Sequence, residues 1–155
     1  MDLVPIAIDV NDAPLELCKQ QGASHVFNSM SNSNYVSDIK ALTPKNLGVH
    51  AAAVFSNVQA AYNSAPALLR PGGVWMFIGI CGKPIEVSTF HLATGSYRVV
   101  SDSTGIPSRM PEAVAFTAKH GIVPDVEVRE GLESVNSMVE DMMAGRVKGR
   151  MGVAF

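Results

Sequence analysis

The side chains of this sequence that could do chemistry are few and widely spaced. Cys18 and Cys81 lie far apart without a C-x-x-C pair. A structural zinc site needs four ligands at short spacings, and a disulfide framework needs more cysteines, so we interpret both as free thiols. The histidines share no metal-ligand spacing, and they are His25, His50, His91 and His120. We expect no metal site built from these residues alone, and we interpret the histidines as surface or strand-end side chains.

One run of residues suggests a nucleophile. Asp102 lies between Ser101 and Ser103, but the spacing places no histidine beside them, and the G-x-S-x-G pattern is absent from the sequence. P-loop, kinase and EF-hand patterns are absent from it too. The chemistry therefore has to come from how the elements of the chain bring side chains together.

The composition indicates an ordinary globular protein. The 155 residues are 47% hydrophobic and 17% charged, with a formal net charge of −2. This length suits one domain, and the high apolar content argues against disorder. This slightly negative net charge does not indicate a basic surface that would bind nucleic acid or an anionic membrane. Because the longest apolar run, residues 73–81, is too short to span a bilayer and the first residues do not form a signal peptide, we expect a cytoplasmic protein.

Apolar periodicity alternates between strand-like and helix-like along the chain. We expect strands at 3–10, 24–28, 48–55, 74–80, 97–100, 123–128 and 150–155, and helices at 12–21, 36–42, 58–69, 110–120 and 132–144. Asp12 is the expected N-cap of the first helix, and Pro71 with the next two glycines is expected to end the third. Strands that alternate with helices at this spacing predict an α/β fold with a parallel sheet.

Several stretches of the sequence together resemble one known family. They are PIAID at 5–9, LCKQQGASHVF at 17–27, GVHAAAV at 48–54, LLRPGG at 68–73, FIGI at 77–80 and MAGRVKGR at 143–150. In this order and spacing they resemble the C-terminal, nucleotide-binding part of the medium-chain, zinc-type alcohol dehydrogenases, especially the fungal and yeast-like branch. Each stretch alone is a weak signal, and the resemblance runs through the whole chain.

The resemblance implies an incomplete Rossmann-type parallel sheet with flanking helices. Residues 1–109 would form a partial NAD-binding domain, and residues 110–155 a strand–helix–strand segment returning toward the family's catalytic domain. The family's first strand, its G-x-G-x-x-G turn and its N-terminal catalytic domain with the zinc ligands have no counterpart in this sequence. The first strand is central in the sheet order 3-2-1-4-5-6. The strands ending at Asp9 and Val54 would then have no ladder partner between them.

This gap could have three different consequences. The two edges could close by a new pairing, another chain could supply the missing strand, or the chain could fold poorly and aggregate.

The resemblance also implies five cofactor-binding residues. Asp9 ends the second family strand, where a carboxylate accepts hydrogen bonds from a ribose hydroxyl and favours NAD over NADP. Arg150 matches an arginine that meets the cofactor pyrophosphate, and Ser56, Ile78 and Ile80 lie at the carboxyl ends of strands beside the nicotinamide. Each residue also has an alternative role. Asp9 could be a strand-end cap, and Arg150 could be a surface arginine that balances the end of a helix, a role that Arg146 and Lys148 could fill equally well. Ser56, Ile78 and Ile80 could simply pack in the core.

Three positions depart from the family pattern. A lysine that often contacts the cofactor is Pro14 here, and an arginine that often follows the segment matching 101–105 is Pro107. His50 matches a histidine common at that place, and we expect it to be structural. These departures weaken the cofactor site that the resemblance implies.

The first functional hypothesis is therefore a remnant of an NAD-dependent alcohol dehydrogenase. The family passes a hydride between an alcohol and NAD, with zinc polarising the alkoxide. Without zinc ligands or a phosphate-binding loop, this chain alone is expected to be inactive or to bind NAD weakly. A second hypothesis is a non-catalytic subunit that pairs through its open sheet edges with a full-length relative or with itself, and a third is a repurposed, non-redox Rossmann fragment that binds a small molecule. No nucleic-acid or membrane partner is expected.

Overall fold

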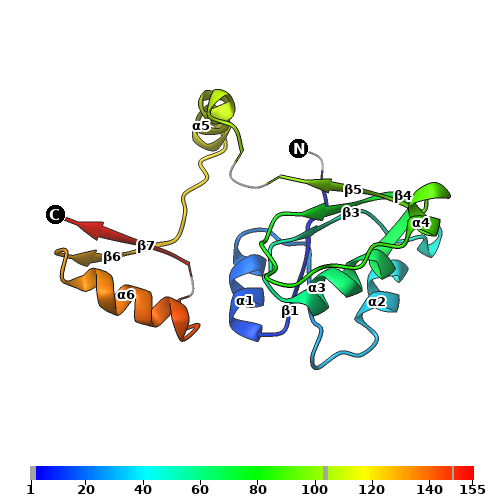
Figure 1. Ribbon diagram of the computed structural model, residues 1–155, viewed down its shortest axis with the longest axis horizontal. Coiled ribbons are helices and arrows are strands. Elements are labelled where there is room, and N and C mark those ends of the chain that lie inside the picture. The colour runs from blue at the N-terminus through cyan, green and yellow to red at the C-terminus, as the bar shows by residue number, and fades with distance from the viewer. Residues whose placement is uncertain (1–2, 103–104, 148) are drawn as a thin grey trace. The chain divides into compact units, whose positions relative to one another are not determined.

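The computed structural model describes residues 3–102, 105–147 and 149–155 (Figure 1). The chain forms two compact units, residues 1–105 and 106–155, and each is described by itself. All strand pairs described are parallel and helices flank the sheets, which confirms the predicted α/β class. None of the described helices is long and apolar enough to cross a membrane.

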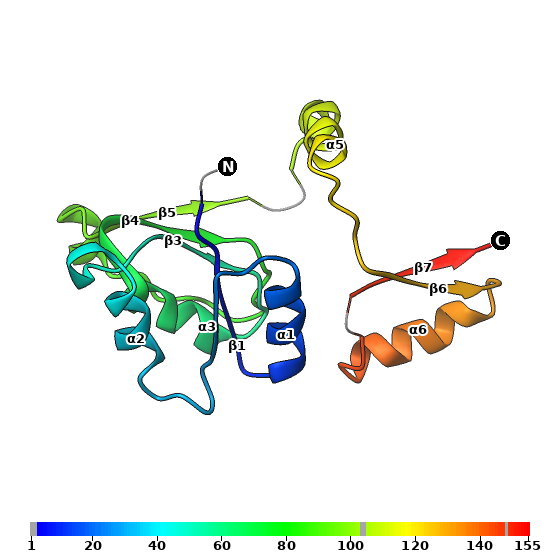
Figure 2. The ribbon, with the colours of Figure 1, turned by 180° about the vertical axis from the view of Figure 1, so that it is seen from behind.

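The first unit contains two sheets. In the smaller one β1 (Ile6–Asp9) pairs with β2 (His25–Asn28), and α1 (Asp12–Gln20) packs against both strands (Figure 2). The larger has the order β3 (Val49–Val54), β4 (Leu69–Phe77) and β5 (Tyr97–Ser101). The other helices are α2 (Tyr35–Ala41), α3 (Gln59–Ser64) and α4 (Thr89–Ala93), with 3-10 turns at Pro44–Asn46 and Ala65–Leu68.

No ladder joins these two sheets within residues 3–102. β1 pairs only with β2, and β3 has only β4 as a neighbour. Within residues 3–102, the strands ending at Asp9 and Val54 therefore share no ladder with each other.

The third helix is shorter than predicted. A helix over 58–69 was expected, but α3 ends at Ser64 and a 3-10 turn follows. Pro66 lies in that turn and has no N–H with which to continue an α-helical ladder. β4 then begins at Leu69, which pairs with Val49 ahead of a register shift, so Pro71 lies inside the strand instead of before it.

Two smaller differences concern helix starts. Asn11, not Asp12, is the N-cap of α1, and the Asp12 carboxylate instead accepts a hydrogen bond from Asn28 Nδ2 at 2.6 Å. The sequence analysis missed α4, whose N-cap Ser88 accepts a hydrogen bond from the His91 N–H. Its five residues are too few for periodicity to reveal.

The core of the first unit is aromatic and lies between the larger sheet and α3. Trp75 on β4 and Tyr62 on α3 are each 1% exposed. The Trp75 ring makes edge contacts with Phe77 at 4.7 Å and with Tyr97 at 5.6 Å between ring centroids, and Tyr62 makes one with Phe77 at 5.1 Å. Such pairs add specific geometry to the area they bury, so they fix α3 against β4 and β5.

The second unit contains α5 (Met110–Lys119), β6 (Val126–Glu130), α6 (Ser134–Met143) and β7 (Arg150–Ala154), with a 3-10 turn at Pro107–Arg109. β6 and β7 are parallel and α6 connects them, as expected for a strand–helix–strand segment. β6 begins later than the predicted 123–128 strand because Pro124 cannot donate to a ladder.

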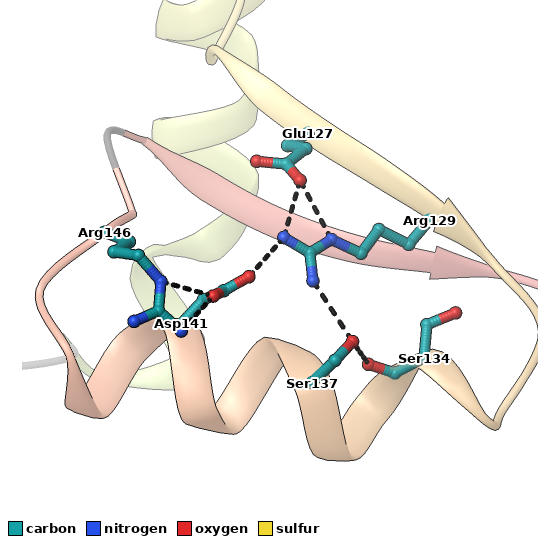
Figure 3. A network of polar contacts seen from close by, with 6 residues as sticks. All are labelled: Glu127, Arg129, Ser134, Ser137, Asp141 and Arg146. Carbon is teal, nitrogen blue, oxygen red and sulfur yellow. Dashed lines mark hydrogen bonds and ion pairs between the residues drawn. The ribbon is translucent and has the colours of Figure 1, made fainter.

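A polar network holds β6 against α6 (Figure 3). The Arg129 guanidinium lies 2.6 Å from a carboxylate oxygen of Asp141 and 2.8 Å from one of Glu127, and it donates to Ser137 Oγ at 3.2 Å. Arg146 pairs with the other Asp141 oxygen at 2.6 Å. Asp141 thus receives a cation on each oxygen, and the Arg129 hydrogen bond, followed by that of Arg146, lowers the pKa of this carboxyl below its usual value.

Candidate functional site

The candidate site residues of the first unit follow the carboxyl ends of its strands. In open parallel α/β sheets ligands bind outside these ends. The structure gathers polar groups at two such places, one after β1 and β2 and one after β3 and β4. We call them the Asp9 cluster, which comprises Asp9, Asn11, Asp12, Asn28 and Ser29, and the Gly79 cluster, which comprises Ser56, Tyr62, Ile78 and Gly79.

Asp9 is half-buried at the end of β1. Its Oδ1 accepts a hydrogen bond from the Asn11 N–H at 2.9 Å, and its main-chain oxygen accepts one from the Ser29 N–H at 2.9 Å. The second carboxylate oxygen has no hydrogen-bond partner among the described residues. One oxygen therefore orders the turn into α1, as the capping interpretation expected, and the other is available to a ligand.

The rest of the Asp9 cluster is held by short side-chain bonds. Asn28 ends β2, donates to Asp12, and accepts hydrogen bonds from the main-chain N–H groups of Met30 and Ser31 at 2.9 and 3.2 Å. The sequence analysis interpreted 29–33 only as a polar loop and gave no role to Asn28. An asparagine at a strand end that can order the next turn is the signal that could have identified it.

The Gly79 cluster is built on a close approach of two segments of the chain. Val54, the last residue of β3, accepts hydrogen bonds at its carbonyl from the N–H groups of Ile78 at 3.0 Å and Gly79 at 2.8 Å. A Cβ atom on Gly79 would lie 2.2 Å from the carbonyl oxygen of Ser56. Only glycine allows this approach, so Gly79 brings the segment after β4 against the segment after β3.

Tyr62 on α3 holds the segment after β4 in this position. Its phenol donates a hydrogen bond to the Gly79 carbonyl oxygen, 2.5 Å away, from the centre of α3. Burial raises the pKa of the Tyr62 phenol above its usual value, and Cys81 adds to the effect. The sequence analysis missed both Tyr62 and Gly79. A glycine near the end of an apolar strand was a usable signal, whereas the partner of the tyrosine was not visible in the sequence.

The three residues predicted beside the nicotinamide differ in their exposure. Ile78 is half-buried, and Ile80 is 79% exposed. Ser56 is half-buried, and its Oγ accepts a hydrogen bond from the Val58 N–H at 3.0 Å. The structure therefore brings Ser56 and Ile78 together through Val54 and Gly79, and it leaves Ile80 facing solvent.

A surface hollow adjoins this cluster. It has a volume of about 450 Å³ and is lined by Asn57, Val58, Gln59, Ala60, Cys81, Gly82 and Lys83. Both walls follow the carboxyl ends of strands, β3 on one side and β4 on the other. The hollow offers amide groups, one lysine and apolar surface, which suits a polar ligand with a flat apolar part.

The described part of the segment around the end of β5 offers two exposed side chains and one main-chain hydrogen bond. Ser101 and Asp102 are exposed, and the Asp102 N–H donates to the Phe77 carbonyl at 3.2 Å. Ser103 and Thr104 lie outside the described residues.

Arg150 lies in the second unit, whereas the other four predicted residues lie in the first. Arg150 begins β7, is exposed, and donates its main-chain N–H to the Asp125 carbonyl at 3.0 Å. Near the end of α6 it is Arg146 that forms an ion pair, with the carboxylate of Asp141. Within the described residues the Arg150 guanidinium forms no ion pair.

No metal centre is formed by the described residues. They contain no group of three histidine, cysteine, aspartate or glutamate side chains close enough to share a metal ion, and both cysteines are free thiols. The donor groups of the described residues therefore do not form a zinc site.

Comparison with known proteins relates these elements to a family. A family model described as zinc-binding dehydrogenase matches residues 1–119. The alcohol dehydrogenase of Geobacillus stearothermophilus is 30% identical over 151 residues, which make up 97% of this chain and 43% of that enzyme. The chain thus spans less than half the length of this relative.

Solved structures agree with the sequence matches. The alcohol dehydrogenase of the archaeon Aeropyrum pernix has a TM-score of 0.82 and 25% identity, over 96% of this chain and 42% of that one. Benzyl alcohol dehydrogenase of Acinetobacter calcoaceticus has a TM-score of 0.78 and 23% identity, also over 96% of this chain and 42% of that one, and it shows the shared fold. Since the family model covers most of the sequence, this chain belongs to the zinc-binding dehydrogenase family.

Proposed function

We propose that this chain contributes the cofactor-binding half of an NAD-dependent alcohol dehydrogenase of the fungal and yeast-like branch. The family resemblance supports this branch, and the two free thiols fit a cytoplasmic location. NAD, when bound, supplies the acceptor for a hydride from an alcohol. The chain itself binds and orients the cofactor, and the zinc is held by residues other than those described.

The observation that carries this proposal is the Asp9 carboxylate. It ends β1 at the ligand-binding edge, one oxygen is fixed by Asn11, and the other is unpaired within the described part of the chain. The unpaired oxygen can accept a hydrogen bond from a ribose hydroxyl, and the charge of the carboxylate repels a 2′-phosphate. We therefore assign Asp9 to the adenosine ribose and expect NADH to bind more tightly than NADPH.

The other four residues have supporting roles. Ser56 and Ile78 lie beside the hollow after β3 and β4, where a main-chain segment fixed by Gly79 can orient a nicotinamide amide. Ile80 supplies exposed apolar surface. Arg150 carries a guanidinium free of ion pairs in the described residues, and such a group matches the oxygens of a pyrophosphate.

A thermal melt of the purified chain with and without NADH tests the proposal. Ligand at one hundred times its Kd stabilises a folded protein by about 2.7 kcal/mol, so NADH should raise the melting temperature by several degrees. Asp9→Asn should weaken binding about tenfold or more, because it removes a charged acceptor. Glu16→Gln on α1 is the matched control, since this exposed carboxylate accepts a hydrogen bond from Gln20 and has no other side-chain partner among the described residues.

Two results would contradict the proposal. One is a cooperative melt that NADH does not shift. The other is equal binding of NADH and NADPH by the native chain, with no loss in Asp9→Asn. Alcohol oxidation by the chain alone is expected to be at background, because the described residues offer no zinc site.

A second function is favoured by a separate observation, since within the described residues β1 and β3 each pair along one edge. A chain with two such edges can serve as a non-catalytic subunit that pairs with a relative or with itself. Size-exclusion chromatography with light scattering, at several concentrations, distinguishes this function from a monomeric NAD-binding chain.

A further inference from the structure

A second hollow lies on the face of the larger sheet that α3 covers, and we call it the Trp75 hollow. It has a volume of about 510 Å³, within the range of about 300–1,000 Å³ that ligand pockets occupy. Trp75 of β4 and Tyr97 of β5 line it from the sheet, and Asn63 of α3 lines it from the helix. Glu86, which precedes α4, and His91 of α4 line it as well.

The Trp75 hollow occupies a different part of the sheet from the candidate cofactor residues. Tyr97 is the first residue of β5, whereas Ser56 and Ile78 follow the last residues of β3 and β4. Gln59 of α3 lines both this hollow and the one after β3 and β4, and its side chain donates to the Pro84 carbonyl at 2.7 Å. Because the two hollows share this wall residue, their occupants have to be distinguished by experiment.

Trp75 brings an unsatisfied hydrogen-bond donor to the hollow. Its side chain is fully buried, and its indole N–H has no hydrogen-bond partner among the described residues. A buried donor left without an acceptor is destabilising, and most buried polar groups of native proteins have a partner. Because the hollow borders this side chain, an oxygen atom bound there can accept the missing hydrogen bond.

Tyr97 adds a second polar group and a flat wall. It is 6% exposed, and its phenol hydroxyl forms no hydrogen bond with the other described residues. Its ring lies edge-on to that of Trp75, with 5.6 Å between centroids, and 5.9 Å from the ring of His91. Three aromatic rings therefore border the hollow beside two polar groups that are free to bond a ligand. Such a lining suits a ligand with a flat apolar part and an acceptor oxygen.

The charge of the lining selects against anions. Among the described residues that line the hollow, Glu86 is the one carboxylate, and none is a lysine or an arginine. Glu86 is exposed and forms no ion pair within the described part of the chain. A carboxylate accepts hydrogen bonds and repels a negatively charged molecule. The ligand therefore needs an N–H donor and no negative charge.

From these relationships we infer that the Trp75 hollow binds a small, flat, uncharged amide, whose carbonyl oxygen accepts a hydrogen bond from the Trp75 indole and whose N–H donates to Glu86. Tyr97 supplies the wall against which the flat part of the ligand packs, and its hydroxyl is a second donor to the carbonyl oxygen. The inference is independent of the cofactor proposal, because none of the residues assigned to NAD lines this hollow.

Titration of the full chain with benzamide tests this site. Trp75 is the only tryptophan of the sequence, so its fluorescence and its indole N–H signal in NMR spectra report on the hollow without overlap. We expect millimolar benzamide to change both signals saturably and to move the indole proton downfield, because this donor gains a hydrogen bond. Benzoate is the matched control, since it has the same shape but a negative charge, and it should bind about tenfold more weakly or less.

Two substitutions test the walls of the hollow. Glu86→Gln keeps the shape of the side chain and removes its charge, so it should weaken benzamide about fivefold and strengthen benzoate. Tyr97→Phe keeps the ring contact with Trp75 and removes one donor, so it should weaken benzamide about fivefold. Tyr35→Phe on α2 is the matched control, because Tyr35 does not line the hollow. Thermal melts of the three variants show whether each remains folded.

Four results would overturn the inference. Indole signals that stay unchanged at millimolar benzamide would mean that solvent alone fills the hollow. Equal binding of benzoate, or equal effects of Tyr97→Phe and Tyr35→Phe, would mean that the lining does not select the ligand. An indole signal that moves with protein concentration before benzamide is added would mean that a second copy of the chain covers the hollow. Displacement of benzamide by NADH would make the hollow a part of the cofactor site.

The cofactor proposal stands or falls on a different readout. NADH binding that is weakened by Asp9→Asn and leaves the indole signal in place supports two separate sites. A chain that responds to benzamide but does not bind NADH would contradict the cofactor proposal alone.

Discussion

The phenol of Tyr62 on α3 donates a hydrogen bond to the carbonyl oxygen of Gly79, which lies 2.5 Å away at the exit of β4. Tyr62 is 1% exposed, so its hydroxyl has no water to replace this acceptor. The bond connects the aromatic core to the segment that lines the candidate cofactor edge. Stability of the core and geometry of the site are thus joined through one side chain.

Tyr62→Phe should lower the free energy of unfolding at pH 7 by about 1 kcal/mol, because it removes a single buried hydrogen bond. The folded pKa of Tyr62 is raised above 10.0, so its contribution is complete below pH 10 and is lost as the pH rises from there through the folded pKa. The difference between the native chain and the variant should therefore shrink above pH 10. Urea melts at pH 7 and at stepped alkaline pH measure this difference, and a constant difference across that range would contradict the assignment.

Gly79→Ala should disrupt the contact between the segments after β3 and β4. Its Cβ would lie 2.2 Å from the Ser56 carbonyl oxygen and 2.6 Å from that of Phe55, and both are main-chain atoms that cannot move alone. We expect a loss of about 1–3 kcal/mol in the free energy of unfolding.

Gly82→Ala is the matched control for this change. Gly82 lies three residues further along the same segment, and an added Cβ there would meet nothing within 4 Å. Its effect should stay within about 0.5 kcal/mol. Equal effects of the two variants in urea unfolding would show that the close approach at Gly79 is absent in solution.

Trp75→Ala should be the most destabilising of these substitutions, at about 3–5 kcal/mol, because it empties the centre of the aromatic core. Trp75→Phe should cost clearly less. It keeps a ring among Phe77 and Tyr97 and removes an indole N–H that has no hydrogen-bond partner in the described residues. Phe90→Ala on α4 is the control, since that ring is 69% exposed. Thermal and urea melts should rank the three variants in this order.

Asp141→Asn should change how the second unit responds to acid. The pKa of Asp141 is lowered from 3.8 by Arg129 and then by Arg146, so its contribution to stability is present above about pH 3.8 and is lost as the pH falls through the folded pKa. The variant should lack this acid-dependent step, and the amide NMR signals of α6 should follow pH less steeply below 4.

Glu140→Gln provides the comparison for the acid experiment. Glu140 precedes Asp141 on α6, is exposed, and forms no ion pair in the part of the chain that is described. It should keep the acid step of the native chain. An acid step that survives in Asp141→Asn would assign it to another carboxyl group.

The sequence by itself predicted the alternation of strands and helices, the parallel α/β class and the strand–helix–strand of residues 126–154. A continuous apolar run such as 48–55 is a local signal for a strand, although β3 is not buried on both faces as this run predicts, since Ala51 and Ala53 are exposed. It also placed Asp9 correctly at a strand end, since a charged residue directly after an apolar run marks where burial stops. The start of β4 was wrong, because Leu69 enters the strand through pairing with Val49, which lies far away in the chain.

The tertiary structure alone decided which groups meet. The Tyr62 phenol and the Gly79 carbonyl are separated by a turn and a strand, and nothing local to either residue specifies the other. The pairing of β1 with β2 and of β3 with β4 is likewise not specified locally, since the same residue pattern fits a strand in the middle or at the edge of a sheet. Periodicity fixes which side of a strand is apolar, but long-range pairing fixes which hydrogen-bonding groups are satisfied and which remain open to a ligand or a partner.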